Sequence, residues 1–97
     1  MRFQWDEEKN EQNIRKHGFD FADAWEVFQN ALIARIDSRE DYGEDRWHGI
    51  GVLQGRTVVV VFAERDPDIV RIISLRKANK NEKKQYEKAI KNRLDPH

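Results

Sequence analysis

The sequence predicts a single α+β domain, in which a small antiparallel sheet is combined with two N-terminal helices and one C-terminal helix. Helical patterns with capping residues occupy the start and the end of the chain, whereas β-branched runs fill the middle. Short turn sequences separate these runs, which favours antiparallel pairing of neighbouring strands. The length of 97 residues allows only one hydrophobic core, so residues 1–97 are expected to form one domain.

The first elements expected are a short strand and a polar helix. Residues 2–5 alternate polar and aromatic side chains, which indicates a strand. Asp6 suits a helix N-cap because acidic residues follow it. The helix should end at residue 16 or 17, since Gly18 fits the left-handed position that follows many helices. Ile14 is its only aliphatic anchor, so we expect the helix to lie over the domain.

A second helix is expected after Asp20, which is a plausible cap. Its aromatic and small residues recur at i, i+3, i+4 and i+7, a spacing that puts them on one helical face. These residues are Phe21, Ala24, Trp25 and Phe28. We expect the whole stripe to pack into the core.

Four strands are expected in the middle of the chain, over residues 31–36, 46–53, 57–62 and 69–75. The third is apolar on both faces, which predicts a central position in the sheet. Gln54-Gly55 and residues 65–68 have turn chemistry, so the last three strands should form an antiparallel meander. Residues 37–45 are polar, contain Gly43 and are expected to form a loop.

The last element expected is a basic helix over residues 79–94, with Asn79 or Asn81 as its N-cap. Tyr86, Ala89 and Ile90 would form a narrow apolar seam. The other faces carry Lys80, Lys83, Lys84, Lys88 and Lys91.

Charge is divided unequally along a chain whose formal net charge is zero. Residues 1–64 contain 8 Lys or Arg and 13 Asp or Glu, a net charge of −5, and residues 65–97 contain 10 and 5, a net charge of +5. This asymmetry favours a polyanionic partner at the basic end. The alternative is that the lysines only solvate a surface helix.

Several classes of protein are excluded or disfavoured. The absence of cysteine excludes disulfides, thiolate catalysis and Cys-based zinc sites. No P-loop or Gly-rich nucleotide motif occurs, and the three histidines lack metal-ligand spacing, so no metal or cofactor is expected. The N-terminus does not resemble a signal peptide, and the longest apolar run, 58–63, is too short to span a membrane. We therefore expect a soluble, cytoplasmic protein without a membrane partner.

Several short motifs occur in a defined order. They are Phe3-Gln4-Trp5-Asp6, Lys9, Asn13, Lys16-His17-Gly18, Phe21-x-x-Ala24-x-x-Val27-Phe28, Asp37, Glu44-x-Arg46, Gly51, and Arg71-Ile72-Ile73-Ser74-x-Arg76-Lys77-Ala78 with Glu82 and Tyr86. Together they resemble the BrnT family of bacterial type II toxins over residues 2–86. The chain departs from the family at Leu75, where alanine is usual.

The resemblance implies a fold similar to that of the RelE-type microbial ribonucleases. It also implies a metal-independent, mRNA interferase-like endoribonuclease that cleaves RNA and arrests translation. The partner implied is a BrnA-type antitoxin, which inhibits the toxin in a hetero-oligomer. Operator DNA would be contacted only through that antitoxin.

Metal-free RNA cleavage needs activation of a 2′-hydroxyl, stabilisation of the phosphorane charge and protonation of the leaving 5′-oxygen. Arg76 and Lys77 lie where a predicted strand ends, and an arginine fork can hold two phosphate oxygens. Ser74 shares the strand face of Arg76 and is a candidate phosphate contact. The alternative for Arg76 is an ion pair with an internal acid such as Glu44.

His17 is the main candidate for acid–base chemistry, because histidine titrates near neutral pH. A histidine in the last turn of a helix also acts as a favourable C-terminal cation, and the sequence leaves both explanations open. His48 and His97 are interpreted as incidental.

Lys9 and Arg65 complete the catalytic candidates as possible phosphate contacts. Instead of a phosphate, Lys9 could contact Asn13 at i, i+4 on the same helix. Arg65 could simply be a solvated turn residue. The acid and base of Glu44-x-Arg46 are better explained by an internal salt bridge. The candidate RNA-binding residues are Ser74, Lys80, Lys83, Lys84 and Tyr86.

Tyr86 offers either stacking on a base or proton donation, but its position in the apolar seam favours core packing. Two further hypotheses use the same residues. One is a non-catalytic nucleic-acid-binding module or corepressor, and the other is an inactive adaptor whose cations are held in internal salt bridges.

Overall fold

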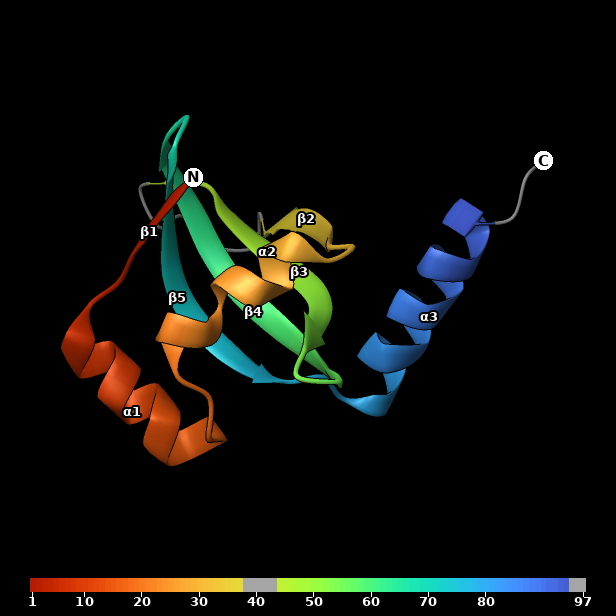
Figure 1. Ribbon diagram of the computed structural model, residues 1–97, viewed down its shortest axis with the longest axis horizontal. Helices are drawn as coiled ribbons and strands as arrows, with labels where there is room; N and C mark the ends of the chain where they lie inside the picture. The colour runs from red at the N-terminus through yellow and green to blue at the C-terminus, as the bar shows by residue number, and fades with distance from the viewer. Residues whose placement is uncertain (38–43, 95–97) are drawn as a thin grey trace.

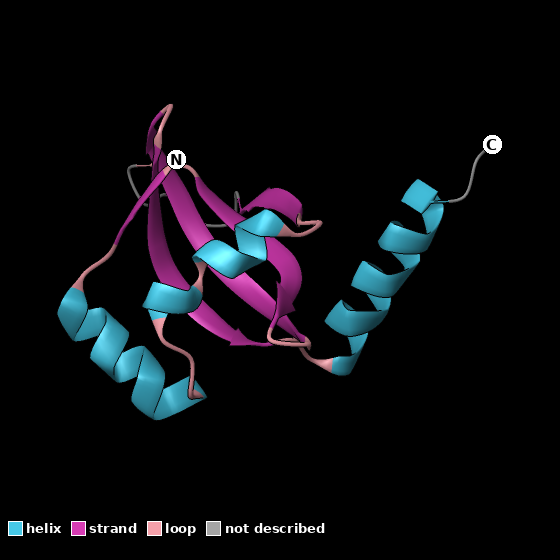
Figure 2. Ribbon diagram, viewed as in Figure 1, coloured by secondary structure: helices cyan, strands magenta, loops and turns pink. Residues whose placement is uncertain are grey.

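The computed structural model describes residues 1–37 and 44–94, so Gly43 of the predicted loop and the terminal His97 lie outside the described residues. Within the described part, one five-stranded sheet has the order β1-β5-β4-β3-β2 and is accompanied by three α-helices and a 3₁₀ helix (Figures 1 and 2). The elements are β1 (Arg2–Gln4), α1 (Glu7–His17), η1 (Phe21–Asp23), α2 (Trp25–Gln29), β2 (Ile33–Asp37), β3 (Arg46–Leu53), β4 (Arg56–Asp66), β5 (Ile69–Lys77) and α3 (Lys80–Leu94). The predicted α+β class is confirmed.

β4 is the central strand of the sheet, as its sequence predicts. It pairs antiparallel with β3 and with β5, and its Val58, Val59 and Val60 are buried. The β3–β4 turn has Gln54 and Gly55 at positive φ (50° and 77°), the signature of a type I′ hairpin. β2 adds to the other side of β3 in antiparallel register. The predicted meander of β3, β4 and β5 is therefore confirmed.

β1 adds a parallel edge that the sequence does not predict. It pairs with the start of β5, with Arg2 opposite Ile69 and Gln4 opposite Arg71. A three-residue strand carries little periodic information, and its partner lies at the other end of the chain. The sheet is consequently mixed, although all its longer strands are antiparallel.

The core lies between one face of the sheet, called the covered face below, and the segment that contains α1, η1 and α2. Gly51 on β3 allows a close approach there, because a Cβ atom at this position would lie 2.7 Å from Cγ1 of Val27 on α2. The buried cluster consists of Phe19, Phe21, Ala24, Val27, Leu53, Val58, Val60, Phe62, Val70, Ile72 and Leu75. The family departure at Leu75 is thus a fully buried packing position.

α1 is anchored by two asparagines and not by Ile14, which is 39% exposed. The amide of Asn13 donates to the carbonyls of Phe19 (3.0 Å) and Leu75 (2.9 Å), and its oxygen accepts from the N–H of Leu75 (3.2 Å). Asn10 similarly accepts from the N–H of Phe21 (2.8 Å). Asn13 thus provides hydrogen-bond partners for the backbone of Leu75, which lies past the part of β5 that pairs with β1. The sequence predicted Ile14 as the anchor of α1, and the structure shows that Asn10 and Asn13 have this role instead.

The predicted second helix consists of a 3₁₀ turn, η1, followed by the short helix α2. This division corrects the prediction that Trp25 packs into the core with the rest of the aromatic stripe. Asp20 caps a 3₁₀ turn through the N–H of Ala22 (2.9 Å), and α2 begins only at Trp25. A 3₁₀ turn has three residues per turn, so it shifts the phase of the residues that follow. Val27 is therefore buried, whereas Trp25 is 51% exposed.

α3 begins with a reciprocal capping box between Asn79 and Glu82. The N–H of Glu82 donates to Asn79 Oδ1 (2.8 Å), and the N–H of Asn79 donates to Glu82 Oε1 (2.9 Å), which selects Asn79 over Asn81 as the cap. Tyr86 is buried and its hydroxyl donates to the carbonyl of Ala31 (2.8 Å). The remaining turns project from the body of the molecule (Figure 1).

None of the helices within residues 1–37 and 44–94 combines the length and apolar character needed to cross a membrane.

Candidate functional site

The face of the sheet opposite the core, called the open face below, carries a pocket whose lining combines polar and apolar side chains. Gly49 and Gly51 contact covered-face side chains, so the alternating residues His48 and Ile50 point to the other side. Val59 lies opposite Ile50, and Arg76 lies opposite Val59. The pocket has a volume of about 130 Å³ and is lined by residues of β2, β3, β4 and α3. They include Arg35, His48, Ile50, Val59, Glu82 and Gln85.

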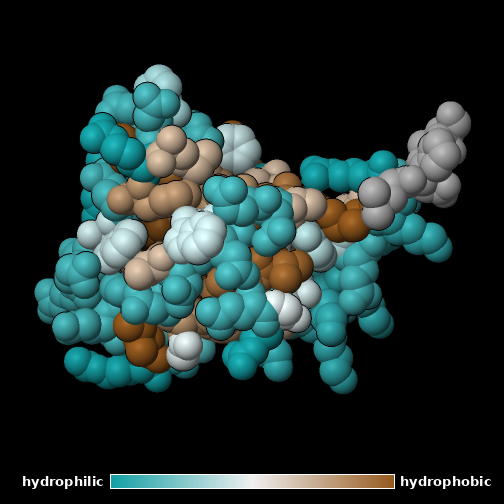
Figure 3. Space-filling view, in the orientation of Figure 1, coloured by the Kyte–Doolittle hydropathy of each residue, from teal (hydrophilic) through white to brown (hydrophobic). Residues whose placement is uncertain are grey.

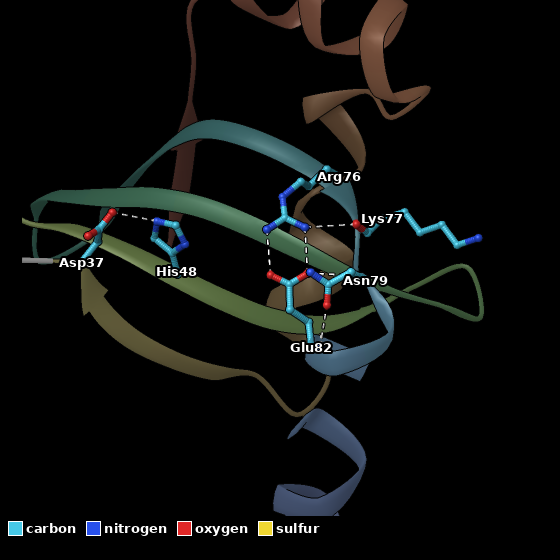
Figure 4. A network of polar contacts seen from close by, with 6 residues as sticks. All are labelled: Asp37, His48, Arg76, Lys77, Asn79 and Glu82. Carbon is cyan, nitrogen blue, oxygen red and sulfur yellow. Dashed lines mark hydrogen bonds and ion pairs between the residues drawn. The ribbon is translucent and has the colours of Figure 1, made fainter. Parts of the chain in front are cut away.

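Arg76 is held at this pocket by a two-point contact with Glu82 (Figure 4). Nη1 donates to Oε1 at 2.8 Å, and Nη2 donates to Oε2 at 2.7 Å. Nη1 also donates to the carbonyl of Lys77 at 3.2 Å. The Arg76 side chain is about one-third exposed and lies beside the pocket, whose lining includes its partner Glu82. The predicted ion pair of Arg76 with an internal acid thus exists, but the acid is Glu82 and not Glu44.

The same contact determines the charge of Glu82. Hydrogen bonding from Arg76 lowers the pKa of the Glu82 carboxyl to about 2, and the N–H of Asn79 and the charges of Arg76 and His48 act in the same direction. Glu82 in turn raises the pKa of Arg76 above its ordinary value. Because Glu82 also closes the capping box, one carboxylate joins the start of α3 to the end of β5.

His48 and Asp37 form a second polar pair on the open face. Nε2 of His48 lies 3.0 Å from Oδ2 of Asp37, and the two side chains come from the adjacent strands β3 and β2. Figure 4 shows this pair and the Arg76–Glu82 pair on the same side of the sheet. From the sequence, His48 is interpreted as incidental, and its contact with Asp37 is not predicted. Alternation along β3 was visible in the sequence, but the strand register that brings His48 beside Asp37 was not.

Ser74 and Lys77 lie near Arg76 but differ in orientation. Ser74 shares the strand face of Arg76, as predicted, and lies opposite Val61 on β4. Lys77 is exposed at the end of β5, and its side chain extends away from the Arg76–Glu82 pair (Figure 4).

Arg65 and Lys9 are not brought to the pocket. Nε of Arg65 pairs with Oε2 of Glu44 at 3.1 Å, near the opposite end of β4 from Val59, a separation of roughly 20 Å along the strand. Glu44, which the sequence predicts to pair with Arg46, thus forms an ion pair with Arg65. Lys9 is exposed on α1, which packs mainly against β5, and it does not line the pocket.

His17 occupies the last turn of α1, beside β5 and outside the pocket lining. Burial, and then the charges of Lys16 and Arg76, lower the pKa of its imidazole. This shift favours the neutral ring, which weakens the explanation of His17 as a helix-end cation.

The basic surface of α3 extends from the pocket to solvent. Lys80, Lys83 and Lys84 are exposed, whereas Tyr86, expected as a candidate base contact, is used for packing. Long hydrophilic side chains fan out over α3 at the right of Figure 3. Of the five predicted RNA-binding residues, the three lysines therefore face solvent, Ser74 lies on the open face and Tyr86 lies in the interior.

The chain is similar to one family of known proteins. Residues 5–82 match the family model described as the ribonuclease toxin, BrnT, of a type II toxin–antitoxin system. Among solved structures, the chain is similar to the 1.1 Å crystal structure of the Brucella abortus ribonuclease toxin, BrnT. The sequence identity is 34% and the TM-score is 0.65, and the match covers 82% of this chain and 99% of that chain. No curated protein sequence matches the chain.

Proposed function

The chain belongs to the BrnT family of ribonuclease toxins of type II toxin–antitoxin systems, and from this premise we propose that it cleaves RNA without a metal ion and arrests translation. A BrnA-type antitoxin would neutralise it in a hetero-oligomer, and operator DNA would be contacted only through that antitoxin. The toxin would act in the cytoplasm, where its RNA substrate is found.

The position of Arg76 on the open face carries this proposal. A phosphodiester entering the pocket meets a planar guanidinium whose orientation Glu82 already fixes, so little conformational entropy is lost when a phosphate oxygen replaces one carboxylate contact. The guanidinium then stabilises the negative charge that grows on the phosphorane. Ser74 offers a hydroxyl on the same face, whereas Lys77, whose side chain extends away from this pair, would contact RNA only beyond the end of β5.

Three of the predicted catalytic residues receive less support from the structure because they lie outside the pocket, namely Arg65, Lys9 and His17. Arg65 and Lys9 can contact the RNA chain only at a distance from the cleaved bond. Proton transfer by His17 requires that the cleaved phosphate lie at the edge of β5, on the side of α1, and not in the pocket.

The lysines of α3 supply the sequence-independent part of RNA binding in this proposal. Lys80, Lys83 and Lys84 are close in sequence to Glu82, so an RNA strand that reaches Arg76 also passes the first turns of α3. Such phosphate contacts depend on salt, because binding releases counterions from the RNA. The acidic residues of the N-terminal two-thirds provide a complementary surface for a basic segment of the antitoxin.

A non-catalytic nucleic-acid-binding module is the second candidate function, and one observation favours it. The guanidinium fork of Arg76 is already occupied by Glu82, as in a purely structural ion pair. Such a protein would bind RNA through the same cations, or act as a corepressor with the antitoxin, without breaking a bond.

Incubation of a long RNA with the purified protein in excess chelator, followed by a denaturing gel, separates the two candidates. We expect cleavage by the wild-type protein and a loss of about 100-fold or more in Arg76→Ala. Arg15→Ala is the matched control, because Arg15 is an exposed arginine on α1. RNA that is shifted in a native gel but stays intact would support the binding module. Growth arrest and co-purification with a BrnA-type protein test the cellular role.

A further inference from the structure

His48 and Asp37 form a pair that phosphate binding by Arg76 leaves unexplained. The side chain of Asp37 is only 7% exposed, whereas that of His48 is 29% exposed and lines the pocket. A nearly buried carboxylate therefore holds an imidazole that a ligand can reach. Burial of a carboxylate is costly unless it is paired, so a contact of this kind is a typical part of a functional site.

We propose that His48 is the general base of the cleavage reaction and that Asp37 is its positioning residue. This inference rests on the proposed ribonuclease function and assigns the proton transfer within it to the pocket on the open face. It differs from the expectation based on sequence, in which His17 had that task.

The two polar pairs lie around one pocket (Figure 4). His48 and Glu82 both line it, and Arg76 is bonded to Glu82. The charge of His48 also acts to lower the pKa of Glu82, which agrees with their shared position in the pocket lining. A phosphate bound by Arg76 would thus have the imidazole on its other side (Figure 4).

Asp37 also selects one tautomer of the His48 imidazole. A carboxylate beside Nε2 favours the proton on that nitrogen, because Nε2–H then donates to Oδ2. The lone pair of the neutral ring is therefore on Nδ1, which lies on the side of the ring away from Asp37 (Figure 4). Nδ1 is then the atom that can accept a proton, and Asp37 stabilises the imidazolium that results.

The reaction balances with these groups and water. Nδ1 of His48 takes the proton of the 2′-hydroxyl, the 2′-oxygen bonds to phosphorus, and the bond between phosphorus and the 5′-oxygen breaks. The departing 5′-oxygen takes a proton from water, and the hydroxide formed accepts the proton of His48. The products are a 2′,3′-cyclic phosphate and a 5′-hydroxyl, and nothing is oxidised or reduced.

The charged groups around His48 come from four elements. Arg35 lies directly opposite His48 on β2. Arg46 is two residues before His48 on β3 and therefore points to the same face of the sheet. Among residues 1–37 and 44–94, this set of charged groups is Asp37 and Arg35 from β2, Arg46 from β3, Arg76 from β5 and Glu82 from α3. β4 contributes Val59 and Val61 opposite this region and no titratable side chain there. Asp37 is the group in direct contact, so its removal should dominate any change in the pH dependence.

The test compares His48→Gln and Asp37→Asn with the wild-type protein in single-turnover cleavage between about pH 5 and pH 9. Glutamine can keep a hydrogen bond to Asp37 from the position of Nε2 but has no basic nitrogen. Wild-type cleavage should rise with pH across the range in which histidine titrates and then level off. His48→Gln should lose about 100-fold or more, together with this pH dependence.

Asp37→Asn should act differently, because it keeps a base but removes the carboxylate that stabilises the imidazolium. We expect a loss of about tenfold, the equivalent of one charge-assisted hydrogen bond, and a rate midpoint displaced to lower pH. Glu11→Gln is the control for loss of a carboxylate, since Glu11 is exposed on α1. Circular dichroism confirms that each variant is folded.

Three outcomes overturn the proposal. Wild-type rates and pH dependence in His48→Gln would refute the base and leave the ribonuclease function intact. Slow cleavage by His48→Gln with an unchanged rate midpoint would assign His48 a structural role. RNA left intact by the wild-type protein would refute the ribonuclease function itself, and the base with it.

Discussion

Polar groups occur on both faces of the sheet, but their settings differ. On the covered face, Asn13 is neutral, 7% exposed and bonded only to backbone groups. On the open face, Arg76, Glu82 and His48 are ionisable, partly exposed and bonded to one another or to a carboxylate. The first setting is that of groups that hold a fold together, because their partners cannot turn to water. The second leaves charge available to a ligand.

Burial and charge together distinguish the polar groups that hold this fold together from those that remain available to a ligand. Replacement on the covered face should reduce the free energy of unfolding and leave the chemistry of the pocket unchanged in the folded fraction. Replacement on the open face should change activity or pH dependence with little effect on unfolding.

Asn13→Ala should have the largest effect on stability. It leaves the N–H and the carbonyl of Leu75 and the carbonyl of Phe19 without their partner in a buried region. We expect a loss of about 2–3 kcal/mol in the free energy of unfolding, measured by urea denaturation. Asn30→Ala is the control, because Asn30 also donates to a backbone carbonyl, that of Glu26 at 3.1 Å, but on the surface. Equal losses in both variants would refute the distinction.

Gly51→Ala should have the next largest effect. The added Cβ atom would lie 2.7 Å from Cγ1 of Val27, so α2 must move away from β3. We expect a destabilisation of about 1–3 kcal/mol by urea denaturation, typical of overpacking in a core. The double variant Gly51→Ala with Val27→Ala should recover part of this loss, since it removes the methyl group that clashes. No recovery would place the strain elsewhere.

Much of the fold could be predicted because its signals are local. The Asp6 cap, the Gln54-Gly55 turn and the valine run of β4 each depend on neighbouring residues, and the structure confirms all three. The burial of Val27 in place of Trp25 could not be predicted, because a 3₁₀ turn changes the helical phase. The parallel β1–β5 pairing could not be predicted either, since it depends on tertiary contacts.

The candidate site was predictable only in part, for a similar reason. Arg76 stands at the end of a strand, which the sequence makes visible. Its partner Glu82 is six residues away, but the contact needs the turn between β5 and α3. The pair of His48 and Asp37 depends on the register between β2 and β3. The sequence predicts only a polar loop between these two strands, and such a pattern does not determine the register.

Glu82→Gln should sharpen the comparison through its pH dependence. The folded pKa of Glu82, about 2, lies below its ordinary value of 4.5, so the ion pair with Arg76 contributes stability above that ordinary value. This contribution is lost as the pH falls toward 2. Solvent screens the pair, so we expect a difference of about 1 kcal/mol or less between the wild-type protein and the variant. Urea denaturation at pH 7, 4 and 2.5 should show the two stabilities converging as the pH falls.

Replacement of lysines on the projecting part of α3 should have the smallest effect on folding and should act only on binding. Lys88→Gln with Lys91→Gln removes two exposed charges beyond Glu82, where the family match ends. If both lysines contact RNA phosphates, the slope of log affinity against log salt should fall by about 1.4 for single-stranded RNA. The unfolding free energy should change by less than about 0.5 kcal/mol. An unchanged salt slope would confine RNA binding to the pocket and the first turns of α3. The lysines of the distal part of α3 would then contribute neither to the stability of the fold nor to ligand binding.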